Sequence, residues 1–356
     1  MPAARTLRIG IVGLGHLHPR LYMPHFQALP GVEVTAVAEP DQRLREAFAA
    51  DFGLRAYASL NDLLKHESLE IAAIFLPHAE CAEAAARCAA RGIHLMVEKP
   101  MASDVKGARR IVQAARKAGV QLTTGYCWRF HPVARRIKSL IAEGAIGRVI
   151  SAEGRCAAGR VTRYIEGHSG WMLEKARSGG GPIFNLGVHW IDLIRWMLAD
   201  EVTEATGLNV HVNRRYDIED QSYAHLRFAG GAVLALDISY TVPDAYPHGR
   251  DLYLAIRGTD GVLSWTPGFE GETETLFLCS DAPGFAGAPN QQISFALEPT
   301  PGYAGFMGRD YIARFVDAVR GTGEPPVSGE DAVAVLNIVR AIYESDERKQ
   351  RVKVRN

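Results

Sequence analysis

The first 125 residues alternate short apolar runs with segments whose apolar residues recur at helical spacing. The runs at 7–15, 71–77 and 93–100 are mostly apolar, which is typical of strands buried on both faces of a parallel sheet. Helical segments such as 103–119 separate these runs. The pattern predicts an α/β domain built on a doubly wound parallel sheet.

Local residue types give two details of these helices. We expect the helix over 16–29 to be interrupted at Pro24, because proline lacks the backbone donor that a helix interior needs. Ser103 is expected to cap the helix that follows it, with Asp104 in the first turn.

The periodicity changes after about residue 150. Residues 222–242 indicate two strands joined by a Gly-Gly turn, and residues 252–265 indicate a second hairpin. A long apolar helix is expected at 181–198, and a further helix capped by Ser328 at 328–348. These elements predict a mostly antiparallel α+β domain after the parallel one.

Composition and charge exclude several classes of function. Of the 356 residues, 47% are hydrophobic, and 40 Lys and Arg balance 40 Asp and Glu, so no basic excess points to nucleic acid or to an anionic membrane surface. The five cysteines form no C-x-x-C pair, which argues against a disulfide framework or structural zinc and favours a reducing, cytoplasmic compartment. No apolar run approaches the roughly 18 residues of a membrane span, and no signal peptide is expected.

A glycine-rich turn follows the first predicted strand. Gly13 and Gly15 match the first two positions of the dinucleotide fingerprint G-x-G-x-x-G, while His18 stands at the third. Glu39 ends the second strand, where an acid accepts hydrogen bonds from ribose hydroxyls and repels a 2′-phosphate, so NAD is favoured. Arg43 lies near this acid and can accommodate a 2′-phosphate, so the sequence does not exclude NADP. In the alternative interpretation, Gly13 and Gly15 only form a tight turn, and Glu39 is a solvated acid in a loop.

The segment His16-Leu17-His18 also resembles a metal-binding pair. No third ligand lies close to it in the sequence, so we expect no metal site here.

The helix expected at 181–198 is apolar nearly all round, and three polar residues interrupt it. The spacing of Asn185, His189 and Asp192 puts them on one face. Either they form a structural network, with Asp192 holding His189, or they face a ligand. The three glycines at 179–181 favour a ligand, since they permit close approach of the backbone.

A lysine stands at the end of another predicted strand. Glu98, Lys99 and Pro100 lie at its carboxyl end, where open α/β sheets bind ligands. The alternative is an ordinary surface pair of little energetic value.

These motifs together resemble the Gfo/Idh/MocA family, which is named after glucose–fructose oxidoreductase, inositol dehydrogenase and rhizopine catabolism. The resemblance covers nearly the whole chain and rests on the fingerprint and on the following segments: "EKP" at 98–100, "GYCWRFHP" at 125–132, "EGAIGRV" at 143–149, "GGGPIFNLGVHWID" at 179–192 and "VSGEDAVAVLNIVRAIYES". It implies a Rossmann domain, a C-terminal domain with an open sheet, nicotinamide chemistry, and homodimers or homotetramers formed through that sheet. The family lysine corresponds to Lys99 and its helix histidine to His189.

Three residues depart from the family pattern. Asn185 stands where the family often has Asp, Cys81 where a histidine is common, and His18 where glycine is usual. Because Asn185 cannot accept a proton, proton transfer would fall to His189 and Lys99.

The resemblance implies an NAD(P)-dependent oxidoreductase that acts on a secondary alcohol or ketone of a sugar, polyol or related cyclic substrate. Residues 1–125 would form the Rossmann domain and residues 126–356 the substrate and oligomerisation domain, whose last helix, about 328–345, would pack back on the first. Two alternatives are an NAD-retaining glycosidase that acts by transient oxidation and a non-catalytic ligand sensor.

The candidate residues fall into three groups. The catalytic candidates are Lys99, His189 and Asn185. The cofactor-binding candidates are Gly13, Leu14, Gly15, His16, Leu17, Glu39, Leu76, Pro77, Glu98 and Lys99. The substrate-binding candidates are Tyr126, Arg129, Trp171 and Asp192.

Overall fold

The computed structural model describes residues 6–243, 245–268 and 273–355, and it divides into two compact units. Unit 1 comprises Met1–Gly125, Tyr164–Gly179 and Thr300–Val333; unit 2 comprises Tyr126–Arg163, Gly180–Pro299 and Ala334–Asn356. Two later segments of the chain, 164–179 and 300–333, therefore group with the first 125 residues. Each unit is described by itself.

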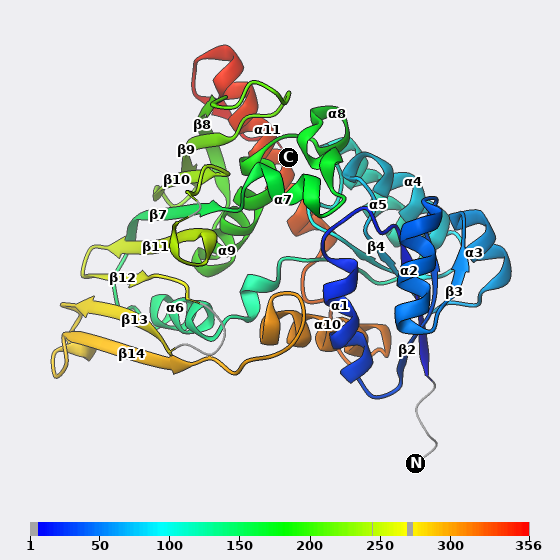
Figure 1. Ribbon diagram of the computed structural model, residues 1–356. Helices are drawn as coiled ribbons and strands as arrows, with labels where there is room; N and C mark the ends of the chain where they lie inside the picture. Colours follow the sequence, from blue (N-terminus) through cyan, green and yellow to red (C-terminus); the bar gives the residue numbers. More distant parts are fainter. Residues whose placement is uncertain (1–5, 244, 269–272, 356) are drawn as a thin grey trace. The chain divides into compact units, whose positions relative to one another are not determined.

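Unit 1 contains a parallel six-stranded sheet, as the apolar runs predict (Figure 1). Its strands are β1 (Leu7–Val12), β2 (Val32–Ala38), β3 (Arg55–Tyr57), β4 (Ile71–Ile74), β5 (His94–Val97) and β6 (Leu122–Thr124). Their order is β3-β2-β1-β4-β5-β6. Successive strands are therefore added toward one edge of the sheet from β1 to β3 and toward the other edge from β4 to β6, and the order reverses where β1 and β4 are neighbours. Ligands of such sheets bind beyond the carboxyl ends of the strands at this reversal.

The helices of unit 1 correct two expectations. Those between the strands are α1 (Pro19–Ala28), α2 (Gln42–Phe52), α3 (Leu60–His66), α4 (His78–Ala89) and α5 (Val105–Ala118). α1 begins at Pro19 rather than at residue 16 and continues through Pro24. The N-cap of α5 is Asp104, whose carboxylate accepts from Gly107 N, and not Ser103.

Later segments of the chain add further helices to this unit. The later elements wholly within unit 1 are η2 (Gly170–Leu173), α8 (Lys175–Ser178) and α10 (Gly305–Val319). Two helices have residues in both units, namely α7 (Val161–Glu166) and α11 (Gly329–Arg348). Ser328 caps α11 as expected, since its hydroxyl accepts from Asp331 N at 3.0 Å.

Unit 2 contains a nine-stranded sheet in the order β14-β13-β12-β11-β7-β10-β9-β8-β15. Its strands are β7 (Val149–Ala158), β8 (Val202–Val210), β9 (Gln221–Phe228), β10 (Val233–Ser239), β11 (Arg250–Gly258), β12 (Gly261–Trp265), β13 (Thr273–Ser280), β14 (Asn290–Ala296) and β15 (Val352–Lys353). β7 and β10 pair in parallel, and each of the other neighbouring pairs in this order is antiparallel. The hairpins β9–β10 and β11–β12 confirm the two that the sequence predicts.

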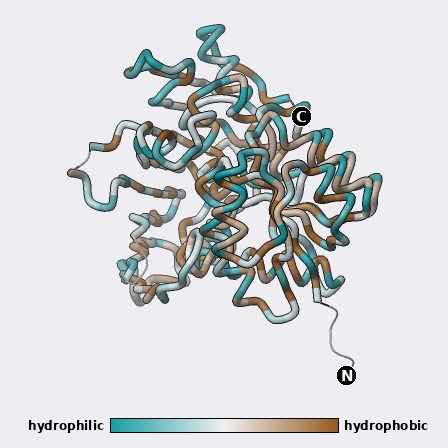
Figure 2. The backbone as a smooth tube through the Cα atoms, turned by 45° about the vertical axis from the view of Figure 1, so that its right-hand side comes forward, coloured by the Kyte–Doolittle hydropathy of each residue, from teal (hydrophilic) through white to brown (hydrophobic). Residues whose placement is uncertain are grey.

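Helices α6 (Pro132–Ala142) and α9 (Val188–Leu198) pack together in unit 2, and they contact β13 and β7 respectively. Buried residues alternate with solvent-facing ones along β9 and β10, so one face of this sheet belongs to the core. Figure 2 shows the backbone coloured by hydropathy, with brown apolar and teal polar stretches following one another along the tube. The remaining short elements are η1 (Cys127–Phe130), η3 (Ile183–Gly187), η4 (Pro247–Gly249) and η5 (Pro283–Phe285).

The helix expected at 181–198 is not continuous. A π-helical turn over Ile183–Gly187 precedes α9, and both are buried. Such turns are rare and occur frequently at functional sites. None of the helices in the part of the chain described here is long and apolar enough to cross a membrane.

Candidate active site

The glycine loop after β1 has the geometry that its sequence predicts. Gly13 has φ +87°, and a Cβ atom there would lie 2.8 Å from the side chain of Leu76, so this position requires glycine. At Gly15 an added Cβ would meet its nearest heavy atom, in Trp171, only at 3.7 Å. The described protein atoms therefore leave room beside Gly15, where a ligand can approach the backbone.

Glu39 is tied directly to this loop. It follows β2 and is buried, and its Oε2 accepts a hydrogen bond of 2.6 Å from Leu14 N. Its Oε1 accepts from Asp41 N at 2.9 Å. The carboxylate is thus fixed beside the loop, and its oxygens have further lone pairs for hydroxyl donors.

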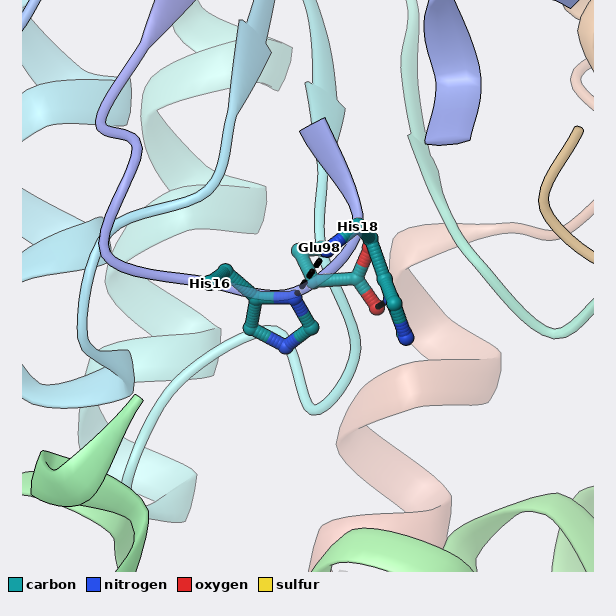
Figure 3. Close-up of side chains that lie close together, drawn as sticks. All are labelled: His16, His18 and Glu98. Carbon is teal, nitrogen blue, oxygen red and sulfur yellow. Dashed lines mark hydrogen bonds and ion pairs between the residues drawn. The ribbon is translucent and has the colours of Figure 1, made fainter. Parts of the chain in front are cut away.

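His18, which replaces the third glycine of the fingerprint, turns toward Glu98 at the end of β5 (Figure 3). His18 Nδ1 lies 3.2 Å from Glu98 Oε1, and Glu98 is only 1% exposed. The ring of His18 also packs on Tyr303, with ring centroids 3.8 Å apart. The imidazole is therefore accommodated by contacts within unit 1.

The neighbouring His16 is a buried, neutral imidazole. Its Nδ1 accepts a hydrogen bond of 3.1 Å from His18 N, which leaves the ring proton on Nε2. Burial, and then the nearby His18, hold the pKa of His16 well below its usual value. Among the described residues, His16 Nε2 and Glu98 Oε2 make no hydrogen bond, and Glu98 Oε1 has the ion-pair contact with His18 but no hydrogen bond.

These unsatisfied atoms fit a dinucleotide. A buried polar group without a partner costs about 1–3 kcal/mol, so a ligand that supplies partners gains that energy. Glu98 can accept from ribose hydroxyls, and His16 Nε2 can donate to a cofactor oxygen.

The same three side chains also meet a geometric criterion for a metal site. One ligand atom from each of His16, His18 and Glu98 lies within 4.8 Å of the others, so the expectation that no third ligand is near was wrong. β5 supplies that ligand from a distant part of the sequence. However, the Nδ1 lone pair of His16 is occupied by His18 N, and the adjacent Lys99 would repel a cation. These two features argue against a metal ion at this cluster.

Two further residues of unit 1 border the loop. Trp171, expected among the substrate-binding residues, donates from Nε1 to the carbonyl of Gly15 and so contacts the glycine loop. His78, which sequence reasoning missed, lies 2.7 Å from Ser178 O through Nδ1 and packs edge-on against Trp171. Burial lowers the pKa of His78 to about 4. Its position directly after Pro77, at the carboxyl end of β4, was the available signal.

In unit 2, the three polar residues of the helical segment 183–198 have different partners. Asn185 Nδ2 donates to Tyr240 Oη at 2.9 Å, and the His189 ring lies 6.1 Å from that of Tyr126. Asp192 binds the Arg129 guanidinium through two bonds of 2.8 and 2.5 Å. Asp192 therefore pairs with Arg129 inside the unit.

The glycines before the π-turn pack against protein. An added Cβ would lie 2.0 Å from Tyr343 Oη at Gly180 and 2.0 Å from Glu219 O at Gly181. Gly181 N and the Tyr343 hydroxyl both donate to the carboxylate of Glu219, and burial raises the pKa of Tyr343 well above its usual value. These two glycines thus accommodate Glu219 and Tyr343, which corrects the expectation that they admit a ligand.

Comparison with known protein families gives one match in the N-terminal part of the chain and another in the C-terminal part. Residues 7–126 match the oxidoreductase family with an NAD-binding Rossmann fold, and residues 134–264 match the GFO/IDH/MocA C-terminal domain.

Similar proteins cover nearly the whole chain. 1,5-Anhydro-D-fructose reductase of Ensifer adhaerens is 27% identical over 92% of both chains. D-xylose 1-dehydrogenase (NADP(+)) 2 of Haloferax volcanii is 26% identical over 96% of this chain and 98% of its own. The solved structure of GenD2 from gentamicin A biosynthesis in complex with NAD has a TM-score of 0.82 at 26% identity, and covers 100% of this chain and 98% of its own. The chain belongs to the Gfo/Idh/MocA family of NAD(P)-dependent oxidoreductases.

Proposed function

We propose that this enzyme transfers a hydride between NAD and a secondary alcohol or ketone of a sugar, polyol or related cyclic substrate. The observation that carries the proposal is the buried Glu98-Lys99 pair at the carboxyl end of β5, next to the glycine loop and its unsatisfied polar atoms. The relatives, a sugar dehydrogenase and an anhydrosugar reductase by name, support the substrate class.

Unit 1 carries the residues proposed to hold the cofactor. Glu39 would accept from the adenosine ribose, and the backbone around Gly13 and Gly15 would receive the pyrophosphate. Glu98 and His16 would bind the remaining ribose and an adjacent oxygen. When bound, NAD supplies the carbon that accepts or returns the hydride.

Two residues are proposed to act on the reacting oxygen. Lys99 is only 3% exposed, and its ammonium would hydrogen-bond that oxygen and stabilise developing negative charge. His189 would take the hydroxyl proton during oxidation and return it during reduction. Asn185 would orient the substrate. The proposal requires Lys99 of unit 1 and His189 of unit 2 to serve the same substrate oxygen.

We also propose a homodimer or homotetramer formed through the sheet of unit 2. Leu208 and Tyr223 are cross-strand neighbours on β8 and β9, and both are exposed. Exposed apolar side chains that adjoin on a sheet are typical of an interface. Light scattering of the purified protein tests this, and Leu208→Glu is expected to lower the mass.

The function is tested by a panel of sugars and polyols, each incubated with NAD or NADP, with NADH or NADPH formation as the readout. We expect turnover with a hydroxylated cyclic substrate and a preference for NAD. Cleavage of a glycoside without net NAD reduction would contradict the proposal, as would binding of panel members without turnover. A matched sample with a chelator should show an unchanged rate, because the roles proposed for Lys99 and His189 require no metal ion.

A further inference from the structure

A segment from the middle of the chain packs on the glycine loop of unit 1. This segment, residues 164–179, carries Trp171, which is 5% exposed and packs edge-on against the ring of His78. Trp171 Nε1 donates to the carbonyl of Gly15. The end of the same segment is held as well, because His78 Nδ1 lies 2.7 Å from Ser178 O. The indole is therefore fixed against the loop by its own segment and by the start of α4.

The bond between Trp171 and Gly15 has one possible direction. An indole N–H donates and cannot accept, and a carbonyl oxygen accepts and cannot donate. The peptide that joins Gly15 to His16 is trans, so its C=O and its N–H point to opposite sides of the chain. Because Trp171 holds the Gly15 carbonyl, it turns the His16 N–H to the other side of the loop.

Three successive backbone N–H groups of this loop have no hydrogen-bond partner among the described residues. They belong to Gly15, His16 and Leu17. The N–H groups on either side of the three are bound, one by Glu39 and the other by the ring of His16. Successive N–H groups left open just before a helix bind anions such as phosphate. The middle one of the three is the His16 N–H, whose direction Trp171 sets.

We propose that Trp171 is a positioning residue that orients the Gly15–His16 peptide so that the His16 N–H binds the pyrophosphate of the dinucleotide. The inference rests on the cofactor site of the proposed function and adds to it a residue 156 positions away in the sequence. It moves Trp171 from the substrate-binding candidates to the support of the glycine loop. Since the oriented group is an N–H that binds phosphate oxygens, the effect of Trp171 should follow the pyrophosphate and not the nicotinamide.

The test is calorimetry of wild type and Trp171→Phe with ligands that contain different parts of the dinucleotide. Phenylalanine keeps a ring against His78 but has no N–H to donate. NAD and ADP-ribose, which share the pyrophosphate, should both bind about five- to tenfold more weakly, the effect of one hydrogen bond. Adenosine, which has no phosphate, should bind within about twofold of wild type. Trp190→Phe removes a similar indole–carbonyl bond, to Tyr253 O in unit 2, and is the matched control that should leave all three affinities unchanged.

Steady-state kinetics add a readout that general damage to the fold would not imitate. With the sugar or polyol found in the panel, Trp171→Phe should raise KM for NAD by about the same factor as the dissociation constant. Its kcat and its KM for the sugar should stay within about twofold of wild type, because the pyrophosphate takes no part in the chemistry. A loss of kcat with KM for NAD unchanged would overturn the inference.

A measurement on the wild type does not depend on the folding of the variant. Hydrogen exchange followed by mass spectrometry reports on peptides that cover residues 13–18 and 168–173. ADP-ribose should slow exchange in both, because the loop is bound while its contact with Trp171 is kept. Exchange in 168–173 that does not slow, or that becomes faster, would show that this segment does not hold the bound loop, and would overturn the inference.

Four calorimetric outcomes would also overturn it. Unchanged affinities for NAD and ADP-ribose would show that the peptide does not depend on Trp171, and weaker binding of NAD alone would place Trp171 at the nicotinamide. Tighter binding of both would show that Trp171 obstructs the loop. An equal loss for adenosine would show that the change is not specific to phosphate. Binding of NAD by the wild type without turnover of any substrate would contradict the proposed function alone.

Discussion

Glu39 Oε2 accepts a hydrogen bond of 2.6 Å from Leu14 N. This bond joins the acid that follows β2 directly to the glycine loop that follows β1. A residue that binds the loop can influence cofactor choice through its charge and through the shape of the loop. Both effects depend on the same carboxylate.

Glu39→Ala should weaken NAD binding about tenfold or more, because a hydrogen bond to a charged group contributes about 1.5–3 kcal/mol. NADP binding should weaken less, since the repulsion of a 2′-phosphate is also removed. Calorimetry with both dinucleotides measures the ratio. Glu33→Ala, at an exposed position of the same strand, is the control. An unchanged ratio would assign selectivity to another group, such as Arg43.

The buried pair of His18 and Glu98 predicts a stability effect. His18→Gly restores the usual fingerprint residue but removes the buried imidazole beside Glu98, so the free energy of unfolding should fall by about 1–3 kcal/mol. Urea unfolding measures it. His18→Gly combined with Glu98→Gln should lose less than the two single changes together. Strict additivity would show that the two side chains are not coupled.

The pair Asp192–Arg129 is expected to act on stability rather than on catalysis. Removing one partner of a buried ion pair costs about 3–5 kcal/mol, so Asp192→Ala should lower the free energy of unfolding by that amount. The kcat of the folded protein should stay within about threefold. Asp51→Ala breaks the pair of Asp51 with Arg20, in which both side chains are more than half exposed, and should cost under about 1 kcal/mol. A large loss of kcat in Asp192→Ala would instead assign Asp192 to the substrate.

His78 predicts a dependence of stability on pH. Its pKa is lowered to about 4 in the folded protein, so below its unfolded value of about 6.5 the unfolded chain binds the additional proton. The contribution of His78 to the free energy of unfolding should therefore be fully present above about pH 6.5 and should decline as the pH falls toward about 4. The His78 contribution between pH 7 and pH 5 is roughly 2 kcal/mol.

Urea unfolding of wild type and His78→Asn at these two pH values isolates that contribution. The variant should lose less stability on acidification than the wild type does. Equal losses would show that burial of His78 does not control this part of the pH dependence.

The sequence was most informative where function depends on local pattern. The sequence pattern predicted strands β1, β2, β4 and β5 and the hairpins β9–β10 and β11–β12, and the spacing of the fingerprint placed Gly13, Gly15 and Glu39 beside one another. Strands such as β3, β7 and β8 were not identified in this way. The N-cap at Asp104 was missed by one residue, since Ser103 and Asp104 are both good capping types.

Contacts between residues far apart in the chain could not be predicted in this way. Asn185 and Tyr240 are 55 residues apart, and Asp192 and Arg129 are 63 apart. Helical spacing placed Asn185 and Asp192 on one face, but their partners come from a strand end and from a short helix. The π-turn over Ile183–Gly187 also has no periodic signal in one sequence.

The central claim is that Lys99 and His189 act on one substrate oxygen. It is tested most directly by kcat for NAD reduction in Lys99→Ala, His189→Ala and the double variant, with NAD affinity measured in parallel. Each single change should lower kcat by ~10²–10⁴-fold while NAD still binds, and the double variant should lose less than the product of the two. A single variant that keeps kcat within a few-fold of wild type, or a double variant whose loss equals the product, would contradict the account.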